Sequence, residues 1–528
     1  MIYLILSTIP AWIYLGMKAK NQLQMLQQNW YDNDHRYLYW IWKNKKKLFF
    51  QIELFFLLFI LLIYVNFQTH ALLIFAFYFY LLTKEKSKKR QNKLSLKFTK
   101  RIRRLVVTLF ILYLLPYIFG LIFYPGINLY LFYFFFALSI YVLPFYVVVA
   151  NIINIPIEKF VSYYYKRKAI HKLRSMQNLK VIGITGSYGK TSSKNILYDV
   201  LSTKYNVFKT PKNYNTPMGM MLSINNFLDK FNDYFIAEMG AFKKGEIKEL
   251  CEMMHPTYGI LTKIGTAHLE SFGSQKNIQE GKFELIESLP KDGIGILNMD
   301  DPLQVEYKLK NSCKIVWIGI ENEKADVLAT NIKVSEHGMK FDCKFKGDKK
   351  SYAFETKLLG KANIYNILAS IALGRELSIP MEQLIHGVKK VNAVEHRLEL
   401  KRMGEITIID DAYNSNPVGA KMALEVLDLM PGKKIIVTPG MIELGEKQYE
   451  YNKEFGKQIA SVCDAVILVG KKQTKPIYDG LLEKKYNSNK IYILEDVKEA
   501  FPLIMKLKEK NTYALLENDL PDILLEEK

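Results

Sequence analysis

The sequence predicts an N-terminal α-helical transmembrane domain followed by α/β structure: a central P-loop ATPase-like domain with a parallel sheet, then a C-terminal Rossmann-like α/β domain. Three observations predict this order. Long apolar runs fill the first 150 residues, a glycine-containing loop follows an apolar run at Val181–Ser192, and two series of short apolar runs then alternate with helix-like segments. At 528 residues the chain is long enough for several domains.

The N-terminal domain is predicted from five apolar runs. A membrane-spanning helix needs about 20 apolar residues, with a lower limit near 17. The second, fourth and fifth runs reach this length, whereas the first and third are short. A cleaved signal peptide is the rival interpretation of the first run, but its lysines follow the apolar stretch and do not precede it. The runs are Ile2–Leu15, Leu48–Val65, Ala71–Leu82, Leu105–Phe123 and Leu129–Ala150.

Charge between the runs predicts their orientation. The segments after the first, third and fifth runs are rich in Lys and Arg, whereas Asn66–His70 and Tyr124–Asn128 contain neither. The positive-inside rule then predicts five spans, an outer N-terminus and a multi-pass protein of the cell membrane whose catalytic domains are cytoplasmic. If two short runs are interfacial hairpins instead, three spans leave the later residues on the same side.

Composition bears on partners and compartment. The net charge is +21, which in a soluble protein would suggest nucleic acid. Because much of this charge lies between apolar runs, we expect a membrane-embedded chain and no nucleic-acid partner. The four cysteines show no paired spacing, which argues against a disulfide framework or zinc site and suits a reducing compartment.

The α/β part divides into two series of short apolar runs. Alternating strands with glycine turns at Val327–Glu355 end the first series, and the second begins near Arg397. We therefore predict a transmembrane domain at 1–150, a juxtamembrane linker at 151–179, a central ATP-binding domain at 180–394 and a C-terminal domain at 395–528. The expected strands are Val181–Thr185, Tyr234–Ala237, Tyr258–Thr262, Ile294–Asn298, Ile315–Ile318, Ile406–Asp410, Lys434–Thr438, Ala465–Val469, Lys490–Leu494 and Thr512–Leu516.

The loop at Val181–Ser192 is typical of a nucleotide-phosphate site. Backbone N–H groups of the turn and of the following helix can bind phosphate oxygens, Lys190 adds charge at the β- and γ-phosphates, and the Thr191 hydroxyl can reach Mg²⁺. The strict motif needs glycine where Ile184 stands, so the match is the shorter Gly-x-x-Gly-Lys-Thr. An ordinary glycine turn is the alternative. The predicted ATP-binding residues here are Gly186, Ser187, Gly189, Lys190, Thr191 and Ser192.

Further polar motifs follow the loop in order. Glu238 ends an apolar strand, which is a usual place for a metal-binding carboxylate in an open α/β sheet. The other segments carry conspicuous polar residues at the ends of predicted strands or helices. They are Asn213–Gly219, Thr266–Ser274, Gly281–Glu284, Asn298–Pro302, His396–Glu399, Asp410–Pro417 and Pro439–Gly445.

This ordered series resembles the Mur ligase family, and within it most closely the MurF branch, which adds D-alanyl-D-alanine. The resemblance covers about residues 180–510. It implies an ATP-dependent carbon–nitrogen (acid–amino acid) ligase, in which a substrate carboxylate attacks the γ-phosphate and an amine then displaces phosphate from the acyl phosphate. Positioning and charge neutralisation supply such catalysis.

The resemblance also implies a metal site. Lys190, Glu238, His268 and Lys282 would be catalytic, and Thr191, Glu238, His268 and Lys282 would hold Mg²⁺. Lys282 matches the lysine that the family carbamylates, a change that turns a cation into an anionic oxygen ligand suited to Mg²⁺. Taken alone, Glu238 can be a solvated strand end, His268 a surface or core histidine, and Lys282 an ordinary helix lysine.

The remaining implied contacts are with ATP. Arg397 would contact phosphate and Asp411 the ribose, whereas Asn298 and Asn366 fall at family positions near the nucleotide. Without the resemblance, Arg397 and Asp411 can equally serve as structural residues at the start of a domain.

Three departures from the family bear on the substrate. Only about 30 residues, Asn151–Lys180, separate the last apolar run from the loop, too few for the domain that holds a UDP-sugar in soluble members. Ala362 stands where the family often has histidine. The stretch Leu515–Asp522 is acidic where MurF is basic, which favours a more cationic incoming amine or is only a solvated tail.

We therefore expect a membrane-anchored ligase of peptidoglycan precursor synthesis, joining an amino acid or dipeptide to a UDP-linked or lipid-linked cell-wall precursor. A ligase for another polymer, such as a γ-linked polyglutamate, is an alternative. So is a catalytically degenerate Mur-like membrane scaffold, although the intact site residues argue against it. A transporter ATPase is disfavoured because the chain shows no second nucleotide motif of that class and few intramembrane charges.

Overall fold

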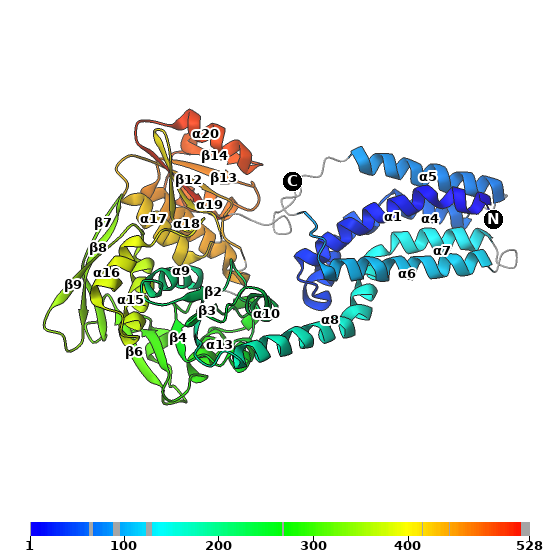
Figure 1. The fold of residues 1–528 in the computed structure, drawn as a ribbon. Coiled ribbons are helices and arrows are strands. Elements are labelled where there is room, and N and C mark those ends of the chain that lie inside the picture. Colours follow the sequence, from blue (N-terminus) through cyan, green and yellow to red (C-terminus); the bar gives the residue numbers. More distant parts are fainter. Residues whose placement is uncertain are drawn as a thin grey trace. The chain divides into compact units, whose positions relative to one another are not determined.

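The computed structural model describes residues 2–62, 67–87, 95–122, 129–266, 269–413, 415–442 and 444–518 (Figure 1). It divides into two compact units, the first over Met1–Tyr163 and the second beginning at Tyr164. Helix α8 (Leu143–Arg174) runs through this division, and through most of the linker predicted at 151–179.

The first unit is helical. Its apolar side chains form one core in which aromatic rings meet, such as Trp12 with Tyr117 at 5.3 Å and with Phe136 at 5.5 Å between ring centroids. Beside this core the Glu53 carboxylate accepts hydrogen bonds from Tyr14 and Lys18. The elements are α1 (Ile2–Gln28), a π-helical turn (Asn33–Tyr37), α2 (Leu38–Lys43), α3 (Lys45–Phe49), α4 (Ile52–Leu62), α5 (Phe67–Ser87), α6 (Lys100–Ile122), α7 (Leu129–Tyr141) and the first part of α8.

This unit corrects the predicted membrane topology. Among the described residues two helices, α6 and α8, are long and apolar enough to cross a membrane, and the core helix of a soluble protein passes the same test of length and composition. The predicted five-span, multi-pass cell-membrane localisation is therefore wrong. Parts of the second run and the whole segment Tyr124–Asn128 lie outside the described residues.

The physical reason is that apolar runs also supply the core of a helical bundle. The first run is only the start of α1, whose second half is polar and carries Lys18 and Lys20. The third run continues into Lys84 and Lys86 at the end of α5, and α7 has 13 residues. Sequence hydropathy does not distinguish side chains buried against neighbouring helices from those in contact with lipid.

The second unit begins with a nine-stranded sheet of order β2-β3-β1-β4-β5-β6-β7-β8-β9. All pairs from β2 to β7 are parallel, and β7-β8-β9 are antiparallel, so the alternating segment forms hairpins on the edge of the predicted parallel sheet. The strands are β1 (Lys180–Thr185), β2 (Val207–Lys209), β3 (Tyr234–Glu238), β4 (Tyr258–Leu261), β5 (Ile294–Asn298), β6 (Lys314–Gly319), β7 (Val327–Ser335), β8 (Gly338–Phe345) and β9 (Ser351–Thr356).

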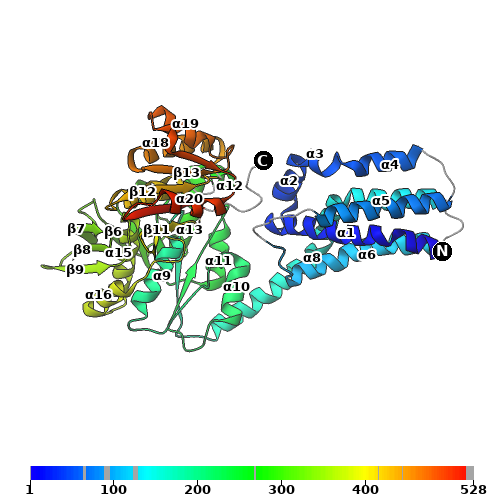
Figure 2. The ribbon, with the colours of Figure 1, turned by 90° about the horizontal axis from the view of Figure 1, so that it is seen from above.

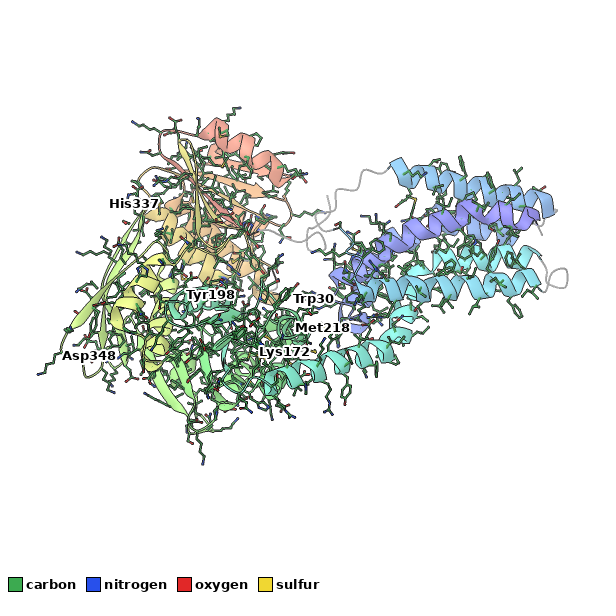
Figure 3. The ribbon with its side chains drawn as sticks, viewed as in Figure 1. Trp30, Lys172, Tyr198, Met218, His337 and Asp348 are labelled. Carbon is green, nitrogen blue, oxygen red and sulfur yellow. The ribbon has the colours of Figure 1, made fainter. Side chains whose placement is uncertain are left out.

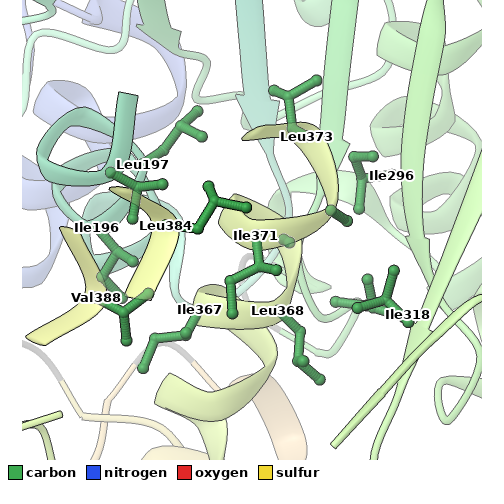
Figure 4. Packing of buried hydrophobic residues seen from close by; sticks show 14 of the residues in the cluster. Ile196, Leu197, Ile296, Ile318, Ile367, Leu368, Ile371, Leu373, Leu384 and Val388 are labelled. Atoms are coloured by element: carbon green, nitrogen blue, oxygen red, sulfur yellow. The ribbon is translucent and has the colours of Figure 1, made fainter. Parts of the chain in front are cut away.

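Helices cover both faces of this sheet. On one face α9, α15 and α16 form a core, in which Ile196 lies near Ile367 and Val388 (Figure 4). On the other face α10, α11 and α13 pack over a second core. The helices are α9 (Lys190–Leu201), α10 (Pro217–Asn226), α11 (Glu246–Met254), α12 (Leu269–Phe272), α13 (Gln275–Glu287), α14 (Pro302–Val305), α15 (Lys361–Glu376) and α16 (Met381–Lys390).

A six-stranded sheet of order β10-β11-β15-β12-β13-β14 follows. Its pairs are parallel except β10 with β11. Helices α18 and α19 lie side by side on it (Figure 2). The elements are β10 (Glu399–Met403), β11 (Ile406–Asp411), α17 (Pro417–Asp428), β12 (Lys433–Thr438), α18 (Gln448–Val462), β13 (Ala465–Val469), α19 (Lys475–Glu483), β14 (Ile491–Leu494), α20 (Ala500–Leu507) and β15 (Thr512–Glu517), with 3-10 turns at Gly445–Lys447, Ser488–Lys490 and Val497–Glu499.

Candidate active site

The loop between β1 and α9 is held in a shape that glycine permits. Gly186 has φ 148° and Gly189 φ 81°, both in the region that side-chain-bearing residues rarely adopt. A Cβ at Gly186 would also collide with the Thr262 hydroxyl. Helix α9 begins after Gly189 without a side-chain cap, so the backbone N–H groups of its first turn, which includes Ser192, remain available for an anion.

Lys190 folds back over this loop. Its Nζ donates to the carbonyl oxygens of Gly186 at 2.7 Å and Ser187 at 3.3 Å. Burial lowers the pKa of Lys190, the Glu238 charge opposes this shift, and the Arg397 charge adds to it. The charges of Lys190 and Arg397 therefore repel one another at the loop, and this arrangement favours the binding of a polyanion.

Glu238 ends β3 directly beside the loop and is 2% exposed. Its Oε1 accepts hydrogen bonds from Thr191 Oγ1 at 3.1 Å and Asn215 Nδ2 at 3.2 Å, and its Oε2 lies 2.9 Å from Lys194 Nζ. A hydroxyl and a carboxylate side by side at a phosphate-binding loop fit the oxygen-ligand chemistry of Mg²⁺. The structure thus brings Thr191 and Glu238 together, as the metal hypothesis requires.

Lys282 lies on α13 and is 1% exposed. Its Nζ is 3.4 Å from the Ala241 carbonyl oxygen and 5.2 Å from the centroid of the Phe272 ring. Burial, followed by the charge of Lys190, lowers the pKa of Lys282 to about 7. A substantial fraction of this amine is therefore uncharged near neutral pH, and an uncharged amine is a nucleophile.

The other predicted residues occupy several surroundings. Asn366, on α15, faces Gly189 closely enough to contact a Cβ placed there. Asn298, at the end of β5, accepts a hydrogen bond from the Asp300 amide at 3.0 Å and so shapes its own turn. Ser187 donates to the Gly265 carbonyl oxygen at 3.2 Å. His268 lies outside the described residues.

Arg397 and Asp411 lie at the start of the six-stranded sheet. Arg397 stands between two residues of positive φ, His396 and Leu398, and its guanidinium carbon is 4.4 Å from the Tyr413 ring centroid. Asp411 accepts a hydrogen bond from the Leu398 amide at 3.2 Å, which ties β11 to this strained segment.

The acidic end of the chain is partly buried. Glu517, in β15, is 1% exposed and accepts a hydrogen bond from Ser415 at 2.6 Å, so this residue is not part of a solvated tail. Burial raises the pKa of Asp411 to about 6, and burial together with the Asp411 charge raises the pKa of Glu517. Residues 519–522 lie outside the described part of the chain.

Because both acids have raised pKa values in the folded state, the folded protein binds more protons than the unfolded chain, and stability falls as pH rises from about 4 through 6 and beyond. Glu517→Gln is expected to remove the charge repulsion between Glu517 and Asp411, and so to stabilise the protein at pH 8, where both acids are charged, more than at pH 5. Thermal unfolding at both pH values measures the difference. Glu509→Gln, at an exposed carboxylate near β15, is the control, and a destabilised Glu517→Gln at pH 8 contradicts the expectation.

Sequence reasoning missed Lys194. A lysine inside a helix is ordinarily solvated, yet this one is 2% exposed and pairs with Glu238. The available signal was its position one turn after Thr191, which places the two side chains on one face of α9.

Two family models match the chain. Residues 184–374 match the Mur ligase middle domain, and residues 396–516 match the glutamate ligase domain of Mur ligases. The two matched segments coincide with the nine-stranded and six-stranded sheets, which carry the loop and Arg397 respectively.

Curated relatives share the same segment. The UDP-N-acetylmuramoyl-tripeptide–D-alanyl-D-alanine ligase of Bacillus subtilis strain 168 is 35% identical over 297 residues, which are 55% of this chain and 63% of that protein. The enzyme of the same name from Escherichia coli strain K12 is 31% identical over 302 residues, 57% of this chain and 66% of that protein. The match thus spans just under two thirds of either relative.

Solved structures have the same fold. MurF from Thermotoga maritima in complex with ADP superposes with a TM-score of 0.61 at 27% identity, covering 69% of this chain and 81% of that one. MurF from Acinetobacter baumannii also gives 0.61, at 26% identity, with 69% and 78% covered.

Proposed function

The chain belongs to the Mur ligase family through the two sheets described above, and from this premise we propose that it is an ATP-dependent ligase that forms amide bonds. One observation carries the proposal: the Thr191–Glu238 pair and Lys190 lie at one glycine loop, and the charge of Lys190 acts on the buried amine of Lys282. In this proposal residues 180–394 form the ATP-binding domain and residues 395–528 the domain that completes the site.

The loop and the first turn of α9 would bind the phosphates of ATP through backbone N–H groups, and Lys190 and Arg397 would neutralise charge on them. Thr191 and Glu238 would hold Mg²⁺, which supplies positive charge at the γ-phosphate when bound. The family resemblance adds His268 and Lys282 to this set. These groups would favour attack by a substrate carboxylate on the γ-phosphate, and then displacement of phosphate by an amine.

Lys282 would act as a carbamate. Carbamylation requires the uncharged amine, and a pKa of about 7 makes this form available at neutral pH. The product is an anion on a buried side chain, which Mg²⁺ and the neighbouring Lys190 would stabilise.

The names of the relatives, which specify a muramoyl tripeptide and D-alanyl-D-alanine, support a proposal for the substrate class. We propose a cell-wall peptide precursor as the carboxylate donor and an amino acid or dipeptide as the amine. Whether the precursor is UDP-linked or lipid-linked depends on residues outside the matched segment.

Phosphate release tests the function. Purified protein, ATP and Mg²⁺ are incubated with D-alanyl-D-alanine and either UDP-muramoyl-tripeptide or its lipid-linked form. Phosphate release is followed, and the mass of the product is measured by mass spectrometry. We expect one of these acceptors to stimulate phosphate release and to gain the mass of the dipeptide. Stimulation by a polyglutamate acceptor alone would instead assign the chain to another polymer, and no hydrolysis with any acceptor would favour the scaffold.

A further inference from the structure

Lys194 is among the largest fully buried side chains of the described residues. Its Nζ lies 2.9 Å from Glu238 Oε2 and donates a hydrogen bond to the Lys212 carbonyl oxygen at 2.5 Å. Burying an ammonium group is costly unless it is paired and hydrogen-bonded, and Lys194 satisfies both conditions through Glu238 and the backbone.

The same carboxylate is fixed on its other side. Glu238 Oε1 accepts hydrogen bonds from Thr191 and Asn215. The backbone is fixed as well, because the Glu238 amide donates a hydrogen bond to Thr210 Oγ1 at 3.2 Å. Thr191 and Lys194 are one helical turn apart on α9. One face of one helix therefore contacts both oxygens of the carboxylate, the hydroxyl at Oε1 and the ammonium at Oε2.

The two oxygens of the Glu238 carboxylate therefore have different partners. Oε1 lies beside the Thr191 hydroxyl at the start of α9, where the phosphate-binding loop ends. Oε2 is turned to a fixed cation that is itself anchored to the backbone at Lys212. A carboxylate held in this way cannot rotate without breaking the contact with Lys194.

We propose that Lys194 is a positioning residue of the metal site: it holds Glu238 Oε2 so that Oε1 and the Thr191 hydroxyl face a divalent cation together. This inference rests on the proposed nucleotide–metal site, but it concerns binding and not the ligase reaction. Groups that orient metal ligands in this way typically contribute about 10- to 100-fold to metal affinity when they are removed by mutation.

Mn²⁺ binding in the presence of ADP, followed by electron paramagnetic resonance, tests the proposal on the full chain. Lys194→Met is expected to weaken Mn²⁺ binding by about 10- to 100-fold, while metal-free ADP binding stays within about twofold, because phosphate contacts come from the loop and Lys190. Lys194→Arg, which keeps the charge, is expected to recover part of the loss.

The matched control is Lys209→Met. Lys209 is a half-buried lysine of β2 that donates to Asn195 of the same helix and lies 4.1 Å from the ring centroid of Tyr198, which is labelled in Figure 3, yet it does not contact Glu238. This variant is expected to leave Mn²⁺ affinity within about twofold of the original, since it removes no ligand-orienting group.

A double variant separates positioning from general packing. If Lys194 acts through Glu238, Lys194→Met adds less than about twofold to the loss caused by Glu238→Gln. Unchanged Mn²⁺ affinity in a folded Lys194→Met protein, or fully additive losses in the double variant, overturns the proposal. If Lys194→Met does not fold, Lys194→Gln, which keeps a donor without the charge, is judged by the same criteria. A failed ligase assay with these metal-binding results intact would reject the proposed function alone.

Discussion

Replacing Lys190 with alanine is expected to reduce acceptor-stimulated ATP hydrolysis by about 100- to 1000-fold, the usual loss when a fixed charge-stabilising group is removed. Lys190 is the cation that lies on the loop itself, where its Nζ contacts the Gly186 and Ser187 carbonyl oxygens. In the proposed function, charge developing on the transferred phosphoryl group would no longer be neutralised by this cation. Phosphate release and ADP affinity are measured side by side.

Lys204→Ala is the control for this substitution. Lys204 follows α9 and is exposed, and its Nζ donates to the Ser378 carbonyl oxygen and lies 5.1 Å from the centroid of the Tyr205 ring. Its removal is expected to leave hydrolysis unchanged. Activity of the Lys190→Ala protein within about tenfold of the original would mean that the loop does not bind the reacting phosphate.

Replacing Lys282 with arginine is expected to lower ligase activity by about 100-fold or more, because the proposed carbamate ligand can no longer form while positive charge is retained. Arginine stays protonated and cannot react with carbon dioxide. The original protein is expected to lose activity when bicarbonate is removed, and to lose it as pH falls below about 7, because protonation of the Lys282 amine prevents carbamate formation.

Carbon-13 NMR with labelled bicarbonate measures the carbamate directly. The original protein is expected to give a carbamate resonance that the Lys282→Arg protein lacks. Lys276→Arg, at an exposed position of the same helix α13, is the control and is expected to keep both the resonance and the activity. Full activity of Lys282→Arg would show that this amine takes no part in the reaction.

The sequence allowed much of the α/β fold to be predicted, because buried parallel strands are short, continuous apolar runs and the loop glycines follow from local backbone requirements. Each strand that was expected in the two sheets is present, with bounds that differ by at most one residue at either end. The edge strands β2 and β10 were not predicted, since Val207–Lys209 is only three residues long and Glu399–Met403 carries charges.

What could not be predicted depends on contacts between distant segments. Lys194 is a buried partner of Glu238 only because β3 lies beside α9, and Glu517 is buried only because β15 enters the sheet next to β11. The membrane topology was predicted wrongly for the same reason, because the apolar runs near the N-terminus are buried against other helices of the first unit. Composition records how apolar a segment is, and not what covers it.

The strand order of the second sheet has a consequence for biosynthesis. β15 is the last strand of that sheet to be synthesised, yet it pairs with β11 on one side and β12 on the other. Until the ribosome has added Thr512–Glu517, the pair β10-β11 and the strands β12, β13 and β14 cannot join into one sheet, because β15 lies between them. The nine-stranded sheet, in contrast, has all its strands once Thr356 is made. The glycine loop between β1 and α9 can therefore form while later segments are still being synthesised, whereas Arg397 and Asp411 reach their final surroundings only after Thr512–Glu517 has been made.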